Sequence, residues 1–80
     1  TMEVNEIFEK VKNLFVDQLG IDTEKVNMEA KLEEDLDIDS LGIVEVVMAF
    51  EDEFEVVIDD DELKDVKTVG QAVNLLHSKL

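Results

Sequence analysis

Apolar side chains recur along residues 4–19 at the spacing of one face of an α-helix. The stripe consists of Val4, Ile7, Phe8, Val11, Leu14, Phe15 and Leu19. Gly20 follows directly, and glycine commonly ends a helix because it adopts the left-handed conformation without strain. The pattern therefore predicts an amphipathic helix of about four turns over this segment.

The next segment, residues 21–39, has no sustained hydrophobic period. Asp22 can start a short helical turn that ends near Val26. The apolar residues of the segment are spaced irregularly: Ile21, Val26, Met28, Ala30, Leu32 and Leu36. Long loops are uncommon in small domains unless they are packed or functional, so we expect these side chains to pin the loop to the core.

The pattern predicts a second helix over residues 40–55, with Asp39 or Ser40 as its N-cap. At about 100° per residue this helix carries two apolar stripes. Its core face consists of Ile43, Val46, Val47, Phe50 and Phe54. On the opposite side lie Leu41, Val44 and Met48. Measured from Leu41, Glu45 and Asp52 fall within about 40° and Glu51 about 80° away.

The outer stripe has two interpretations. Exposed apolar groups rimmed by carboxylates are typical of a docking surface that steers a basic partner. Alternatively, the same apolar side chains pack under the 21–39 loop, or are exposed singly without a function. The residues alone leave both interpretations open.

A short third helix is predicted over residues 59–66, capped by Asp59 or Asp60, and a fourth over residues 68–79, capped by Thr68. Their inward-facing residues are Leu63 and Val66 in the former, and Val69, Ala72, Val73 and Leu76 in the latter. No segment shows convincing strand alternation. We therefore expect an all-α fold, a four-helix bundle with a long loop between helices 1 and 2 and a short third helix.

Charge and composition narrow the function classes. The 80 residues suit one small domain, and 22 acidic against seven basic residues give a formal net charge of −15. Such a surface repels phosphates, which disfavours binding to nucleic acid or to an anionic membrane. We expect a monomer whose partners carry basic patches. No run is long enough to span a bilayer or patterned as a signal peptide, so a cytoplasmic location, or an organelle matrix, is expected.

Metal binding is not predicted at any defined site. The chain has no cysteine, and His77 is its only histidine. Asp35, Asp37 and Asp39 have the spacing of the first ligands of an EF-hand, but the match then fails. The required glycine is replaced by Ser40 and the required glutamate by Val46.

Ser40 lies where the N-terminal end of the second helix is predicted. Such an end has unpaired backbone N–H groups and the positive end of the helix dipole, so it suits an attached phosphate. A serine there commonly does no more than cap the helix. Position alone therefore leaves both a capping role and a modification site open.

The chain resembles the acyl carrier protein family. Asp39-Ser40-Leu41 matches the family signature, and Glu34-Asp35-Leu36, Val44-Glu45 and residues 47–54 extend the match. Gln18-Leu19-Gly20 and residues 66–69 also match, so that the resemblance spans essentially the whole chain as one carrier domain, residues 1–80. It is strongest to discrete carriers of bacterial-type fatty-acid synthesis.

The resemblance implies that Ser40, flanked by Asp39 and Leu41, takes a 4′-phosphopantetheine arm from coenzyme A through a phosphopantetheinyl transferase. The thiol of the arm carries acyl groups as thioesters, and the protein itself is not an enzyme. The resemblance also implies that fatty-acid synthesis enzymes with basic patches dock on the second helix, which favours docking for the outer stripe. The matching positions are Leu41, Val44, Glu45, Met48, Glu51 and Asp52. The bundle is expected to sequester the acyl chain, with Val47, Ala49 and Phe50 making room.

Some positions depart from the common family pattern. Asp37 replaces a frequent glycine, so the turn before the serine is expected to differ. Gly42 replaces a frequent acidic residue and also occurs in D-alanyl carriers. A carrier for another pathway, polyketide or D-alanyl, therefore stays an alternative, as does an acidic helical interaction module without an arm.

Overall fold

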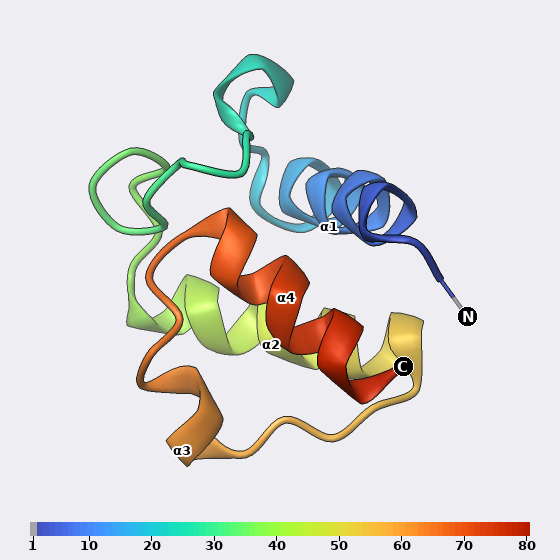
Figure 1. The fold of residues 1–80 in the computed structure, drawn as a ribbon. Helices are drawn as coiled ribbons and strands as arrows, with labels where there is room; N and C mark the ends of the chain where they lie inside the picture. Colours follow the sequence, from blue (N-terminus) through green and yellow to red (C-terminus); the bar gives the residue numbers. More distant parts are fainter. Residues whose placement is uncertain (1) are drawn as a thin grey trace.

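The computed structural model describes residues 2–80, so that Thr1 of the expected domain lies outside the described residues. Its elements are α1 (Val4–Leu19), the 3₁₀ turn η1 (Thr23–Lys25), α2 (Ser40–Phe54), α3 (Asp60–Leu63) and α4 (Val69–Lys79) (Figure 1). Over residues 2–80 there is no strand, only an isolated antiparallel bridge between Lys31 and Thr68. The predicted all-α bundle with a long first connection and a short third helix is confirmed.

The first helix has the predicted bounds. Ile7, Val11 and Phe15 of its stripe are fully buried. Glu3 and Glu6 form a capping box at its start. Gly20 ends the helix at φ 67°, and its N–H donates to the carbonyl oxygens of the last turn. This helix packs against both α2 and α4.

The loop between α1 and α2 is packed as expected. The predicted turn at its start forms η1, capped by the Asp22 carboxylate. Further along, the loop pairs with the segment that enters α4 through three backbone hydrogen bonds. These are Leu32 N to Lys67 O (3.0 Å), Val69 N to Ala30 O (3.0 Å) and Gly70 N to Met28 O (2.8 Å). The side chains that it buries are Val26, Ala30, Leu32, Leu36 and Ile38.

Aromatic rings join α1 to α2 at the centre of the core. The rings of Phe15 and Phe50 meet edge to face, with centroids 5.8 Å apart and planes at 82°. Phe54 extends the cluster, 6.5 Å from Phe50. Phe8 is only half-buried, and the Lys12 ammonium lies 5.6 Å from its ring centroid. The core is therefore centred on α1 and α2, and its remaining buried side chains are aliphatic.

The third helix is shorter than the predicted 59–66, because it ends at Leu63 and a turn follows in which Val66 N donates to Leu63 O at 3.1 Å. Its cap is Asp59, which forms a capping box with Glu62. The Glu62 carboxylate also pairs with the ammonium of Lys79 at 2.9 Å, which ties α3 to the end of α4. The hydrogen bond from the Asp59 N–H, followed by the one from Lys79, lowers the pKa of Glu62 below its ordinary value of 4.5.

The fourth helix begins as predicted, because Thr68 caps it and forms a capping box with Gln71. His77 is exposed in its last turn. Across residues 2–80, none of the helices has the length and the apolar character needed to traverse a bilayer.

Candidate functional site

The start of α2 presents Ser40 to solvent. Asp39 is the N-cap residue: its backbone is extended, and its Oδ1 accepts a hydrogen bond from Gly42 N at 2.8 Å. Ser40 is the first residue of the helix and is exposed. Because Asp39 caps the helix, the hydroxyl of Ser40 is not needed for capping. The interpretation of Ser40 as the cap is therefore wrong, and Ser40 is exposed at the first position of the helix.

The turn before Ser40 depends on Asp37, which has a φ of 55°. This is the left-handed region, where glycine is most at ease and aspartate is better tolerated than most residues. Asp37 therefore adopts a conformation that a glycine would supply without strain. The next residue, Ile38, is buried, and its N–H donates to Leu32 O at 3.0 Å.

Gly42 is buried in the first turn of α2, against Ile38 of the preceding turn. A Cβ atom at this position would lie 2.9 Å from Cγ2 of Ile38, which is closer than side chains tolerate. The glycine is therefore explained by local packing. Its N–H is held by Asp39, which offsets the weakening of the first turn expected from glycine.

The outer stripe of α2 is exposed. Leu41, Val44 and Met48 expose 66%, 54% and 63% of their surface, which contradicts the alternative that they pack under the 21–39 loop. Glu45 and Asp52 are exposed beside them. None of the five ion pairs within residues 2–80 uses either of these two carboxylates. The stripe is thus an apolar strip with uncompensated negative charge at its rim.

Glu51 differs from the other carboxylates of this stripe. Its side chain is half-buried at the edge of the outer stripe, and its Oε2 accepts a hydrogen bond from Ile58 N at 2.9 Å. The sequence predicts the angular position of Glu51 on the helix, but nothing in the local pattern indicates its bond to Ile58 N.

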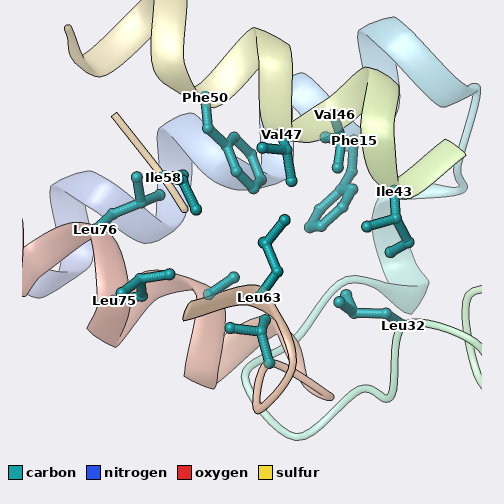
Figure 2. Close-up of a pocket in the computed structure, with 12 residues that line it drawn as sticks. Phe15, Leu32, Ile43, Val46, Val47, Phe50, Ile58, Leu63, Leu75 and Leu76 are labelled. Atoms are coloured by element: carbon teal, nitrogen blue, oxygen red, sulfur yellow. The ribbon is translucent and has the colours of Figure 1, made fainter. Parts of the chain in front are cut away.

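An apolar cavity of about 30 Å³ lies inside the bundle, between α2 and α4 (Figure 2). Helices α2 and α4 and the segment that includes α3 supply most of its wall, and Phe15 and Leu32 complete it. The lining residues are Phe15, Leu32, Ile43, Val46, Val47, Phe50, Ile58, Leu63, Val66, Ala72, Leu75 and Leu76. Of the residues expected to make room for an acyl chain, Val47 and Phe50 line the cavity. Ala49 instead lines a surface groove beside Met48, so this part of the expectation is wrong.

A surface groove of about 300 Å³ adjoins the cavity on the side of α3. The two spaces share Leu32, Ile43, Leu63 and Val66. Glu33, Glu34, Asp60, Lys64 and Lys67 add polar groups to the groove. The apolar interior therefore has its nearest surface opening beside α3 and the first turn of α2, where Ile43 lies three residues after Ser40.

Comparisons with known proteins agree with this geometry. Residues 9–76 match the family described as "Phosphopantetheine attachment site". A curated "Acyl carrier protein" of Petrotoga mobilis is 52% identical over 79 residues, which cover 99% of this chain and 93% of the relative. The chain belongs to the acyl carrier protein family. A second relative of the same name, from a Picosynechococcus species, is 51% identical over 74 residues, 92% of this chain and 91% of its own.

Membership of the acyl carrier protein family sets the class of function. Such proteins are carriers and not enzymes, and the group that they hold is covalently attached 4′-phosphopantetheine. Residues of this structure fit that group: Ser40 is exposed as the first residue of α2, and its neighbour Asp39 caps the helix. Members of the family work with a phosphopantetheinyl transferase and with synthesis enzymes. Within residues 2–80, no cluster of three His, Cys, Asp or Glu side chains is arranged to hold a metal ion.

Proposed function

We propose that the chain is one acyl carrier domain, residues 1–80, that holds its 4′-phosphopantetheine on Ser40. The observation that carries the proposal is the exposed Ser40 hydroxyl at the start of α2, left free by the Asp39 cap, in a chain of this family. When bound, the arm supplies a terminal thiol on which acyl groups are held as thioesters, and the chain itself has no cysteine.

The residues around Ser40 hold and present its hydroxyl. The Asp39 carboxylate accepts the hydrogen bond from the Gly42 N–H, so the Ser40 hydroxyl is not required to cap the helix. The first backbone N–H groups of α2 lie next to the hydroxyl, and such groups favour an attached phosphate. Leu41, exposed on the other flank, offers apolar contact to an enzyme that approaches the serine.

The cavity is proposed to shelter the acyl chain. Its lining is entirely hydrophobic, and burial of each methylene group of an acyl chain contributes about 0.8 kcal/mol. A volume of about 30 Å³ is small, so a long chain requires the surrounding side chains to move apart. The groove beside α3, which shares four lining residues with the cavity, is proposed as the route from the start of α2 into this interior.

The outer stripe of α2 is proposed to dock partner enzymes. Leu41, Val44 and Met48 supply an apolar centre, and Glu45 and Asp52 supply unpaired charge at the rim. A partner with a basic patch fits this surface, because opposite charges steer association and fix orientation. We propose that the partners are a phosphopantetheinyl transferase and enzymes of fatty-acid synthesis in the cytoplasm, and that the carrier acts as a monomer.

Gly42 is the residue that left a D-alanyl carrier as an alternative, because this glycine also occurs in D-alanyl carriers. Its role in the structure is local, since it makes room for Ile38 Cγ2. The glycine therefore does not favour that pathway, and fatty-acid synthesis remains the proposal.

The test is the intact mass after incubation with coenzyme A, magnesium and a promiscuous phosphopantetheinyl transferase. The sequence contains two serines, which gives a matched pair of controls. The wild type and Ser78→Ala should gain one phosphopantetheine, and Ser40→Ala should gain none. If the wild type gains none while circular dichroism shows it folded, the chain is an acidic helical interaction module without an arm.

A further inference from the structure

Glu51 organises the whole turn that leaves α2. Its backbone carbonyl accepts hydrogen bonds from the N–H groups of Glu55 and Val56, the latter at 3.2 Å. Its carboxylate Oε2 reaches further and accepts from Ile58 N at 2.9 Å. One residue near the end of α2 therefore fixes three of the next seven N–H groups.

The last of these bonds sets which side chains enter the cavity. Val57 exposes 73% of its surface, whereas Ile58 exposes 8% and lines the cavity wall. Figure 2 shows Ile58 on the same side of the cavity as Leu76. The segment then leads directly into α3, which supplies Leu63 to the same wall. Loss of the Glu51 bond would free Ile58, which lines the wall from a segment outside the helices.

Glu51 also borders the outer stripe. On the helix it lies one turn after Met48, and residues three apart are neighbours on a helix surface. A guanidinium group that docks on this stripe can bind a carboxylate through both oxygens. Such a contact at Glu51 competes with the Ile58 N–H for Oε2.

We infer that Glu51 is a positioning residue that couples the docking stripe to the cavity: an arginine that engages its carboxylate releases Ile58 and loosens the cavity wall. The coupling is reciprocal, so a filled and ordered cavity weakens the engagement of Glu51 by arginine. The inference rests on the proposed function for what docks and what the cavity holds. The hydrogen bond and the wall are features of the unmodified chain.

The test is backbone amide hydrogen exchange at Ile58, measured by NMR on the unmodified chain. Glu51→Ala should raise the exchange rate at Ile58 about tenfold, because it removes a bond to a charged acceptor. Glu51→Gln keeps an oxygen acceptor and should stay within about threefold of the wild type. Asp52→Ala is the matched control, because its exposed carboxylate lies beside the stripe without holding the loop. The amide of Val73, fully buried in α4, reports any loss of global stability.

The competition between a guanidinium group and the Ile58 N–H for the Glu51 carboxylate is tested by introducing an arginine near Glu51 by substitution. Met48 is 63% exposed, so Met48→Arg places a guanidinium three residues before Glu51 without disturbing the core. It should raise exchange at Ile58 relative to Met48→Gln, with no change at Val73.

Three results would overturn the inference. Unchanged exchange at Ile58 in Glu51→Ala removes the positioning role, and equal exchange in Met48→Arg and Met48→Gln removes the competition. A rise at Ile58 that Val73 matches is global unfolding and also counts against the inference. If Ser40 takes no arm, only the proposed function is contradicted, because hydrogen exchange is measured on the chain without the arm.

Discussion

Replacement of Gly70 by alanine tests how the long loop is held. Gly70 is buried in the first turn of α4, and its N–H donates to the backbone carbonyl of Met28 at 2.8 Å. A Cβ atom added at Gly70 would lie 2.9 Å from that same carbonyl oxygen. Because the neighbour is backbone, no side-chain rotation can relieve the contact.

The magnitude follows from two opposed effects. Alanine is favoured over glycine in a helix by about 1 kcal/mol. To restore an ordinary contact, the loop and α4 must separate by about 0.5 Å, which weakens the bond to Met28 and strains the adjacent bond from Val69 to Ala30. Overpacking of a well-packed site costs about 1–3 kcal/mol, and the weakened hydrogen bond adds roughly 1 kcal/mol. We therefore expect Gly70→Ala to lower the free energy of unfolding by about 1–3 kcal/mol.

Urea unfolding followed by circular dichroism is the assay, because the chain has no tryptophan or tyrosine to serve as a fluorescent probe. With a slope near 1 kcal/mol/M, suited to a small domain, the midpoint should fall by about 1–3 M. Asn74→Ala, at an exposed position of the same helix, adds helix propensity alone and should raise the midpoint slightly. If Gly70→Ala were as stable as Asn74→Ala, the close approach of the loop to α4 would be refuted.

Four further outcomes are expected. Phe50→Ala should lower the free energy of unfolding by about 3–5 kcal/mol, because the ring is buried between two others, and a loss below about 1 kcal/mol would contradict the aromatic core. Glu55 has a φ of 55°, so Glu55→Gly should raise the free energy of unfolding by about 0.5–1 kcal/mol, whereas Glu55→Ala should not. The pKa of Glu62 is lowered by folding, so its carboxylate stabilises the fold above pH 4.5 and stops doing so as the pH falls through the lowered pKa. The wild type should therefore exceed Glu62→Gln in free energy of unfolding, measured in urea, by an amount that shrinks as the pH falls. A difference that stays constant from neutral to acid pH would contradict this assignment. Finally, Glu45→Lys and Met48→Glu should each weaken binding of the transferase by about fivefold to tenfold with unchanged circular dichroism, and unchanged affinity in both would exclude this surface.

The helices could be predicted because their signals are local. The stripe of α1, the glycine after it and the Thr68 cap lie within one or two turns of the backbone groups that they satisfy. The outer stripe of α2 was visible for a related reason: Val46, Val47 and Phe50 already supply a complete core face. Apolar residues beyond such a face have no local partner to bury them.

Features that depend on distant backbone groups left no such signal. The bonds that join Ala30 and Leu32 to the entry of α4 use N–H and carbonyl groups that every non-proline residue has. The same holds for the bond from Ile58 N to Glu51, which requires the path of the chain to be known. The cavity is equally non-local, because its wall combines side chains from α2, the α3 segment and α4.

The two departures from the common family pattern around Ser40 belong to one packing unit. Asp37 turns the chain at φ 55°, and this turn sends Ile38 into the core, where it is 95% buried. Ile38 then occupies the space in which a side chain at position 42 would begin, since its Cγ2 lies 2.9 Å from the missing Cβ atom. A side chain at position 42 would thus force Ile38 to shift. The absence of a charge at position 42 follows from how the loop packs, and the exposed carboxylates beside the outer stripe begin at Glu45.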